Sequence, residues 1–189
     1  MQVFDLLFAL VWIVFYAYWL ISAWQTRSPV KRTQSRLSFL MYGVIWVVIG
    51  LLFVSWISPE LVAARLVPAG LIFTLAGLLI TVAGLAFAVW ARVHLGSNWS
   101  ARPTIRTEHT LTRTGPYRYV RHPIYSGILL GLLGTAIGIG YFIIFACVLI
   151  LLAGFVIKFR MEEKYLEEEF GEEYARYRQE VKALIPYVL

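Results

Sequence analysis

The stretch HPIYSGILLGLLGTAIGIGYFIIFACVLILLAGFVI, residues 122–157, contains no Asp, Glu, Lys or Arg and decides how the chain folds. As one continuous helix it would be about 54 Å long at 1.5 Å per residue, whereas the hydrocarbon core of a bilayer is only about 30 Å thick. The sequence GIGY, Gly138 to Tyr141, supplies glycines that permit the backbone angles of a tight turn. The stretch therefore predicts two membrane-spanning helices joined as a short hairpin.

Apolar stretches before the hairpin predict more spans. They cover residues 6–24, 37–57 and 66–91, and Pro68 would suit the first turn of the last one. The chain is 60% apolar and 15% charged, whereas soluble domains are nearer to half and a quarter. We therefore expect an all-α membrane protein of about five spans that folds as a single domain over residues 1–189, with the N-terminal spans in residues 1–65.

The distribution of positive charge predicts the orientation in the membrane. All 17 Lys and Arg residues except Arg65 fall in the segments 25–36, 92–121 and 158–189. Cytoplasmic loops carry such an excess of cations, so we expect the N-terminus outside and the helical C-terminal region in the cytoplasm. The same bias explains the net charge of +6 without a nucleic-acid partner. Asp5 stands where a signal peptide would be basic, so the first span is expected to remain in the mature protein.

A basic, tyrosine-rich stretch leads into the hairpin: TGPYRYVRHPIYSG, residues 114–127. Pro123 fits the first turn of a helix with His122 near its N-cap, and the free N–H groups there would favour an anion. The rings of Tyr117 and Tyr125 could face a cation or an aromatic base. An interfacial anchor, in which the arginines meet lipid phosphates, explains the same composition.

Two adjacent glutamates follow the hairpin. At 100° per residue, Glu162 and Glu163 flank an apolar helical stripe, and a carboxylate beside such a stripe is costly unless it meets a partner. Gly171 is a plausible helix stop, after which a second short amphipathic helix is expected. The stripe consists of Phe159, Leu166 and Phe170, and the apolar face of the second helix consists of Tyr174, Tyr177 and Val181.

The sequence predicts no metal site. His94, His109 and His122 are scattered, and the single cysteine, Cys147, lies in an apolar run away from them. No glycine-rich phosphate-binding motif and no nucleophile motif of the GxSxG type occurs.

The motifs taken together resemble the isoprenylcysteine carboxyl methyltransferase family. The similar pattern is HTLTRTGPYRYVRHPIYSG, a hydrophobic hairpin, and then EEKYLEEEFGEEYARYRQEV followed by IP, within residues 94–186. The upstream LGSNWS resembles bacterial and archaeal members, so a bacterial inner membrane is the expected location.

The resemblance implies an integral-membrane methyltransferase that uses S-adenosylmethionine, with its catalytic half in residues 91–189. The acceptor would be lipophilic and would reach the cofactor from the bilayer: the carboxylate of an isoprenylcysteine or of a related isoprenoid acid. Matching the family's motifs residue by residue gives the expected cofactor-binding residues: His109, Thr110, Leu111, Thr112, Tyr117, His122, Pro123, Ile124, Tyr125, Glu162 and Glu163.

The acceptor is the more open part of this prediction. Lys158 stands where family members have an arginine thought to bind the substrate carboxylate, and with Arg160 and Arg121 it is a candidate for contacting the acceptor. Lysine keeps the charge but loses the bidentate fork. Alternatives are a phospholipid amine methyltransferase, a sterol-type reductase whose NADPH phosphate would suit Arg113, Arg118 and Arg121, and a scaffold that only binds lipid phosphate.

Overall fold

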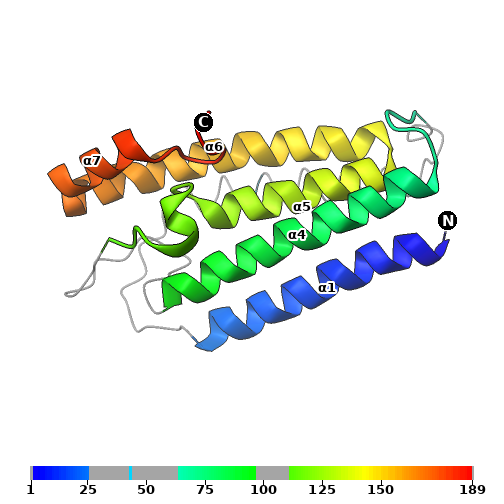
Figure 1. Ribbon diagram of the computed structural model, residues 1–189, viewed down its shortest axis with the longest axis horizontal. Helices are drawn as coiled ribbons and strands as arrows, with labels where there is room; N and C mark the ends of the chain where they lie inside the picture. Colours follow the sequence, from blue (N-terminus) through cyan, green and yellow to red (C-terminus); the bar gives the residue numbers. More distant parts are fainter. Residues whose placement is uncertain (1, 26–42, 44–63, 97–110, 189) are drawn as a thin grey trace.

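The computed structural model describes residues 2–25, 43, 64–96 and 111–188, and helices make up their regular structure (Figure 1). The long helices α1 (Gln2–Gln25), α4 (Leu71–Leu95), α5 (Pro123–Ile139) and α6 (Phe142–Phe170) run alongside one another. A short 3-10 helix, η2 (Gly115–Arg118), and α7 (Glu172–Glu180) lie at one end. No strand forms within these residues, which confirms the all-α prediction for them.

Three of the described helices are long and apolar enough to cross a membrane: α1, α4 and α6. Helix α5 is equally apolar but has only 17 residues. The chain is therefore an integral membrane protein. The predicted span at residues 37–57 lies outside the described residues apart from Gly43, so the total of five spans stays a prediction.

The predicted hairpin is confirmed. Helix α5 ends at Ile139, and α6 begins at Phe142. Between them Gly140 adopts φ 84° and donates its N–H to the Ala136 carbonyl at 2.8 Å. A Cβ atom at Gly140 would also lie 2.6 Å from the Val67 carbonyl oxygen, so both the backbone angle and the space require glycine.

The prediction that the third span starts at residue 66, with Pro68 in its first turn, is wrong. Helix α4 begins at Leu71. The preceding segment binds the hairpin turn instead: the Leu66 N–H donates to Gly140 at 2.9 Å, and the Phe142 N–H donates to Ala64 at 2.9 Å. These tertiary hydrogen bonds hold the backbone of this segment outside the helix.

Helices α4 and α5 approach each other through glycines. A Cβ atom at Gly84 would lie 2.5 Å from the Gly131 nitrogen, and one at Gly134 would lie 2.5 Å from the Thr81 nitrogen. The Thr81 hydroxyl is buried and lies 3.1 Å from the Gly131 carbonyl oxygen. Small residues allow this close contact between membrane helices, where van der Waals packing and interhelical hydrogen bonds replace hydrophobic association.

We expect Gly84→Ala to destabilise the protein by about 1–3 kcal/mol, since the added methyl group forces two backbones apart and this overpacking outweighs the gain in helix propensity. Gly70→Ala is the matched control. Its backbone is extended at φ −178°, and a Cβ there meets only the Phe73 ring at 3.6 Å. Thermal unfolding in detergent measures both variants, and equal midpoints would contradict the close approach of the two helices.

Candidate functional site

The polar site lies at the end of the bundle where α5 begins. The C-terminal segment, residues 181–184, pairs with the chain entering α5: Arg121 N–H donates to the Lys182 carbonyl at 2.8 Å, and His122 N–H donates to the Ala183 carbonyl at 2.9 Å. The Ser126 hydroxyl donates to the Leu184 carbonyl at 2.6 Å. The start of α5 is thereby fixed as predicted, with His122 as the N-cap and Pro123 in the first turn.

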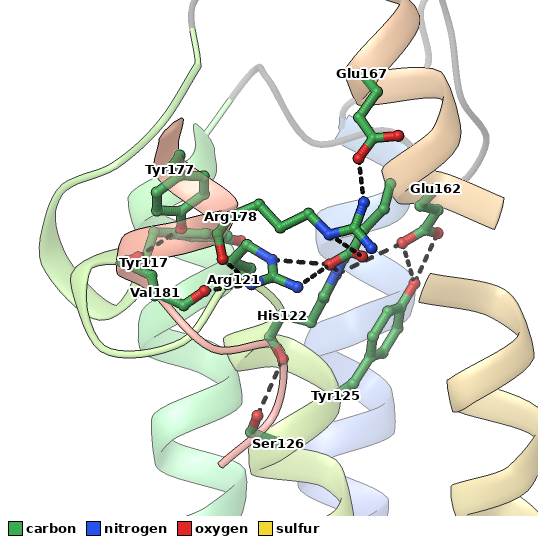
Figure 2. A network of polar contacts seen from close by, with 11 residues as sticks. Tyr117, Arg121, His122, Tyr125, Ser126, Glu162, Glu167, Tyr177, Arg178 and Val181 are labelled. Atoms are coloured by element: carbon green, nitrogen blue, oxygen red, sulfur yellow. Dashed lines mark hydrogen bonds and ion pairs between the residues drawn. The ribbon is translucent and has the colours of Figure 1, made fainter. Parts of the chain in front are cut away.

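A buried ion pair forms the centre of the site (Figure 2). The Arg121 guanidinium donates from Nε to Glu163 Oε1 at 2.8 Å, and its Nη2 lies 2.7 Å from the same oxygen. Its Nη1 donates to the carbonyls of Arg178 and Val181. His122 Nε2 lies 3.1 Å from Glu163 Oε1. The Glu163 side chain is only 6% exposed, so its negative charge is compensated by side chains rather than by water.

The neighbouring carboxylate has a different environment. Tyr125 donates its hydroxyl to Glu162, at 2.7 Å from Oε1 and 2.9 Å from Oε2. Lys158 Nζ lies 3.4 Å from Oε1, one helical turn before it, and His122 Nδ1 lies 3.9 Å from Oε2. The Glu162 side chain is 25% exposed, so it can accept further hydrogen bonds from a ligand.

Flat rings from two helices stack beside these carboxylates. His122 lies against Phe159, with ring centroids 5.0 Å apart, and against Tyr125 at 5.7 Å. Tyr125 stacks on Phe155 at 4.9 Å. The Lys158 ammonium lies 4.9 Å from the centroid of the Tyr125 ring, within the range of a cation–π contact. The site thus joins an aromatic wall to a partly exposed carboxylate.

Helices η2 and α7 close the site on one side. Tyr177 donates its hydroxyl to the Tyr117 carbonyl at 2.6 Å, and both side chains are buried. Burial raises the pKa of both phenols well above the usual value, so both hydroxyl groups stay protonated at neutral pH. Tyr174, on the predicted apolar face of α7, is buried as well.

The structure brings six of the predicted site residues into one cluster: Arg121, His122, Tyr125, Lys158, Glu162 and Glu163. Pro123 and Ile124 lie in the first turn of α5 beside it. Leu111 and Thr112 lie half-buried before η2, and Arg160 is exposed on α6. His109 and Thr110 fall outside the described residues.

Several contributors to this cluster were not predicted from the sequence. Arg178 approaches Glu163, with Nε 3.9 Å from Oε2, and also pairs with Glu167. The backbone of residues 181–184 and the hydroxyl of Ser126 were not foreseen either. No local pattern marks them, since their partners lie far away in the sequence or are backbone atoms. Within the described ranges no three His, Cys, Asp or Glu residues are grouped as metal ligands would be, and the absence of a metal stays a prediction.

The family model for phospholipid methyltransferases matches residues 72–173, which include α5, α6 and both glutamates. The chain belongs to this family. Similar curated proteins include the protein-S-isoprenylcysteine O-methyltransferase of Schizosaccharomyces pombe, 38% identical over 43% of this chain and 35% of that protein. Protein-S-isoprenylcysteine O-methyltransferase B of Arabidopsis thaliana is 33% identical over 52% of this chain and 51% of that protein.

The similarity extends beyond these two proteins. Methanethiol S-methyltransferase 1 of Bradyrhizobium diazoefficiens is 34% identical over 38% of this chain and 24% of that protein. A solved structure of the eukaryotic intramembrane Ras methyltransferase ICMT superposes with a TM-score of 0.54 and 26% identity, over 84% of this chain and 55% of that one. The chain thus spans about half or less of the length of these relatives. The resemblance to isoprenylcysteine carboxyl methyltransferases is confirmed.

We expect Glu163→Gln to lower the free energy of unfolding by about 3–5 kcal/mol, because it leaves the buried Arg121 without its counter-charge. Glu168→Gln is the matched control: it removes the same charge from an exposed position of α6 and should change stability by less than about 0.5 kcal/mol. Thermal unfolding in detergent compares the two variants. Equal stability would mean that Arg121 and Glu163 do not depend on each other.

Proposed function

We propose that the protein transfers a methyl group from S-adenosylmethionine to a lipophilic acceptor at the membrane surface. The observation that carries the proposal is the partly exposed carboxylate of Glu162. It is held against stacked rings from two helices, in a chain of the phospholipid methyltransferase family. Membership of the family supports methyl transfer as the reaction. The cluster around Glu162 supports this end of the bundle as the place where the reaction occurs.

The described residues suit this cofactor. A carboxylate offers about four acceptor positions, and the contacts of Glu162 with Tyr125 and Lys158 leave room for a ligand's amine or hydroxyl groups. Tyr125 and His122 stack on each other and on Phe155 and Phe159, so aromatic rings bound the site beside this carboxylate. We propose that the predicted segment 109–112, Tyr117, His122 to Tyr125 and Glu162 line the pocket.

Glu163 has a different proposed role. Arg121 and His122 contact its carboxylate, and the side chain is buried, so its contribution is to fix the positions of those two residues. His122 is then placed between the two glutamates, with one ring nitrogen toward each. Glu163 is accordingly proposed as a positioning residue, and Glu162 as the carboxylate that contacts the cofactor.

The bound cofactor supplies an electrophilic methyl group on a sulfonium. The chain contributes by holding the two reactants in line, which is worth several kcal/mol in favourable cases, and by excluding water from the reacting groups. No side chain has to remove a proton if the acceptor is already a carboxylate.

Among the predicted acceptor-binding cations, the geometry favours Lys158. Arg121 already contacts Glu163 and two backbone carbonyls, and Arg160 is exposed without a described contact to the cluster. Lys158 lies beside Glu162 and over the Tyr125 ring, and its side chain is partly exposed. We propose that its ammonium group attracts the acceptor's carboxylate.

The proposed acceptor is an isoprenylcysteine carboxylate or a related isoprenoid acid, and the proposed setting is the cytoplasmic face of a bacterial inner membrane. Residues 91–189 form the proposed catalytic half of a single domain. The family description favours a phospholipid amine as a second candidate acceptor. The similar methanethiol S-methyltransferases favour a thiol.

Purified protein should bind S-adenosylhomocysteine saturably, and Glu162→Gln should weaken binding by about tenfold, the effect of one hydrogen bond to a charged group. Tyr125→Phe should weaken binding less, because it removes only the hydroxyl that positions the Glu162 carboxylate. Isothermal titration measures the affinity, and Glu168→Gln is the control that should leave it unchanged. Binding of NADPH alone would instead favour the reductase, and binding of neither ligand would favour a scaffold.

Lys158→Gln should raise KM for a prenylcysteine acceptor more than it lowers kcat, because it removes attraction for the acceptor's carboxylate. Lys158→Arg should restore KM, since it keeps the charge. Transfer of a radiolabelled methyl group to a prenylcysteine, a phosphatidylethanolamine and an alkyl thiol identifies the acceptor class. The proposed carboxylate acceptor would be overturned if only the amine or the thiol were methylated and Lys158→Gln left KM for that acceptor unchanged.

A further inference from the structure

A hollow of about 360 Å³ lies at the end of the bundle opposite the cluster that contains Glu162 and Glu163. Its lining residues come from the start of α1, the start of α4 with the segment before it, and the turn that joins α5 to α6. These elements lie together at one end of the bundle (Figure 1). Helix α4 has 25 residues and is therefore about 37 Å long, which separates this hollow from Glu162 by the length of the bundle. No step of the proposed methyl transfer involves it.

Two opposite charges line the hollow, Asp5 from α1 and Arg65 from the segment before α4. Among the described residues, Asp5 forms neither an ion pair nor a hydrogen bond, and it does not pair with Arg65. A carboxylate and a guanidinium that face the same hollow without meeting can each bind one end of a ligand that carries both charges.

The Arg65 guanidinium is held in place from two sides. Its Nε donates to the Val67 carbonyl at 3.2 Å, and its Nη2 donates to the Ile139 carbonyl at 2.8 Å. The ring of Tyr141 lies against it, with the guanidinium carbon 4.8 Å from the ring centroid. Its Nη1 has no acceptor within the described residues. A cation fixed in this way loses little conformational freedom on binding an anion.

The surroundings of the hollow suit a lipid. Arg65 is the single cation outside the basic segments of the chain, so it does not belong to the basic surface at the other end. Large apolar side chains nearby are exposed: Leu6, Leu66, Leu71, Ile72 and Phe142. These side chains would contact acyl chains, while the polar hollow contacts a headgroup.

We propose that this hollow binds the headgroup of an amine-bearing zwitterionic phospholipid, with the phosphate on Arg65 and the ammonium on Asp5. The Asp5 carboxylate argues against a free phosphate or an anionic lipid, because it would repel a ligand that has no positive end. Arg65 likewise disfavours a ligand that is only a cation. The pair of charges therefore selects a headgroup that carries both.

The test uses the full chain, delipidated in a non-ionic detergent. Short-chain dihexanoyl phosphatidylethanolamine, dihexanoyl phosphatidylglycerol and inorganic phosphate are titrated separately, with thermal stabilisation and native mass spectrometry as readouts. The wild-type protein should bind the ethanolamine lipid saturably and more tightly than the glycerol lipid. Asp5→Asn should weaken binding of the ethanolamine lipid by about tenfold and abolish its preference over the glycerol lipid.

Arg65→Gln should weaken binding of both lipids, since both present a phosphate. Arg65 also binds the hairpin turn, so this variant is expected to lose stability as well. Asp5→Asn removes no described contact, so it is the decisive variant. The matched controls Glu168→Gln and Arg176→Gln, both at exposed positions, should leave lipid binding unchanged.

Equal affinity for the two lipids, or an ethanolamine affinity that Asp5→Asn leaves unchanged, would overturn the proposal. Inorganic phosphate that binds as tightly as the ethanolamine lipid would also overturn it and would indicate a simple anion site. Binding of S-adenosylhomocysteine should be the same in Asp5→Asn and wild type. The outcome at this hollow is therefore separate from the outcome for the methyltransferase function.

Discussion

The arrangement of the site depends on the buried ion pair between Arg121 and Glu163. Removing two charges from water costs several kcal/mol for each ion, and their mutual attraction offsets this only when other hydrogen bonds are also satisfied. Here those hydrogen bonds come from His122 and from the backbone carbonyls of Arg178 and Val181. The pair therefore brings together the entry to α5, the end of α6 and the chain after α7, beside an apolar cluster in which Phe159, Ala183 and Leu184 join the same three parts.

This constraint gives two adjacent glutamates different environments. Successive side chains on a helix point about 100° apart, so when Glu163 turns toward Arg121, Glu162 points toward Tyr125 and Lys158. One carboxylate is used to build the site, and the other stays accessible. The aromatic wall follows from the same geometry, because the His122 ring lies between the two glutamates and stacks on Phe159.

Features that depend on local chemistry could be predicted from the sequence. The hairpin followed from an uncharged stretch too long for one span, and the start of α5 followed from the restricted geometry of Pro123. The wrong start of α4 shows the limit. Pro68 suits a helix, but the Leu66 N–H donates to the distant hairpin turn and the Ala64 carbonyl accepts from it, and these hydrogen bonds decide the backbone there. Arg178 could not be found for the same reason, since its partner Glu163 is distant in sequence and meets it only after α7 folds back on α6.

The position of the cluster along α6 also bears on the acceptor. The apolar part of this helix ends at Ile157, which is exposed, and the next residue is Lys158 beside Glu162. A molecule with a long apolar tail can therefore leave its tail in the bilayer and place a polar head at the cluster without crossing water. The boundary between apolar and charged residues on one helix thus supports the proposed lipophilic acceptor independently of any specific contact.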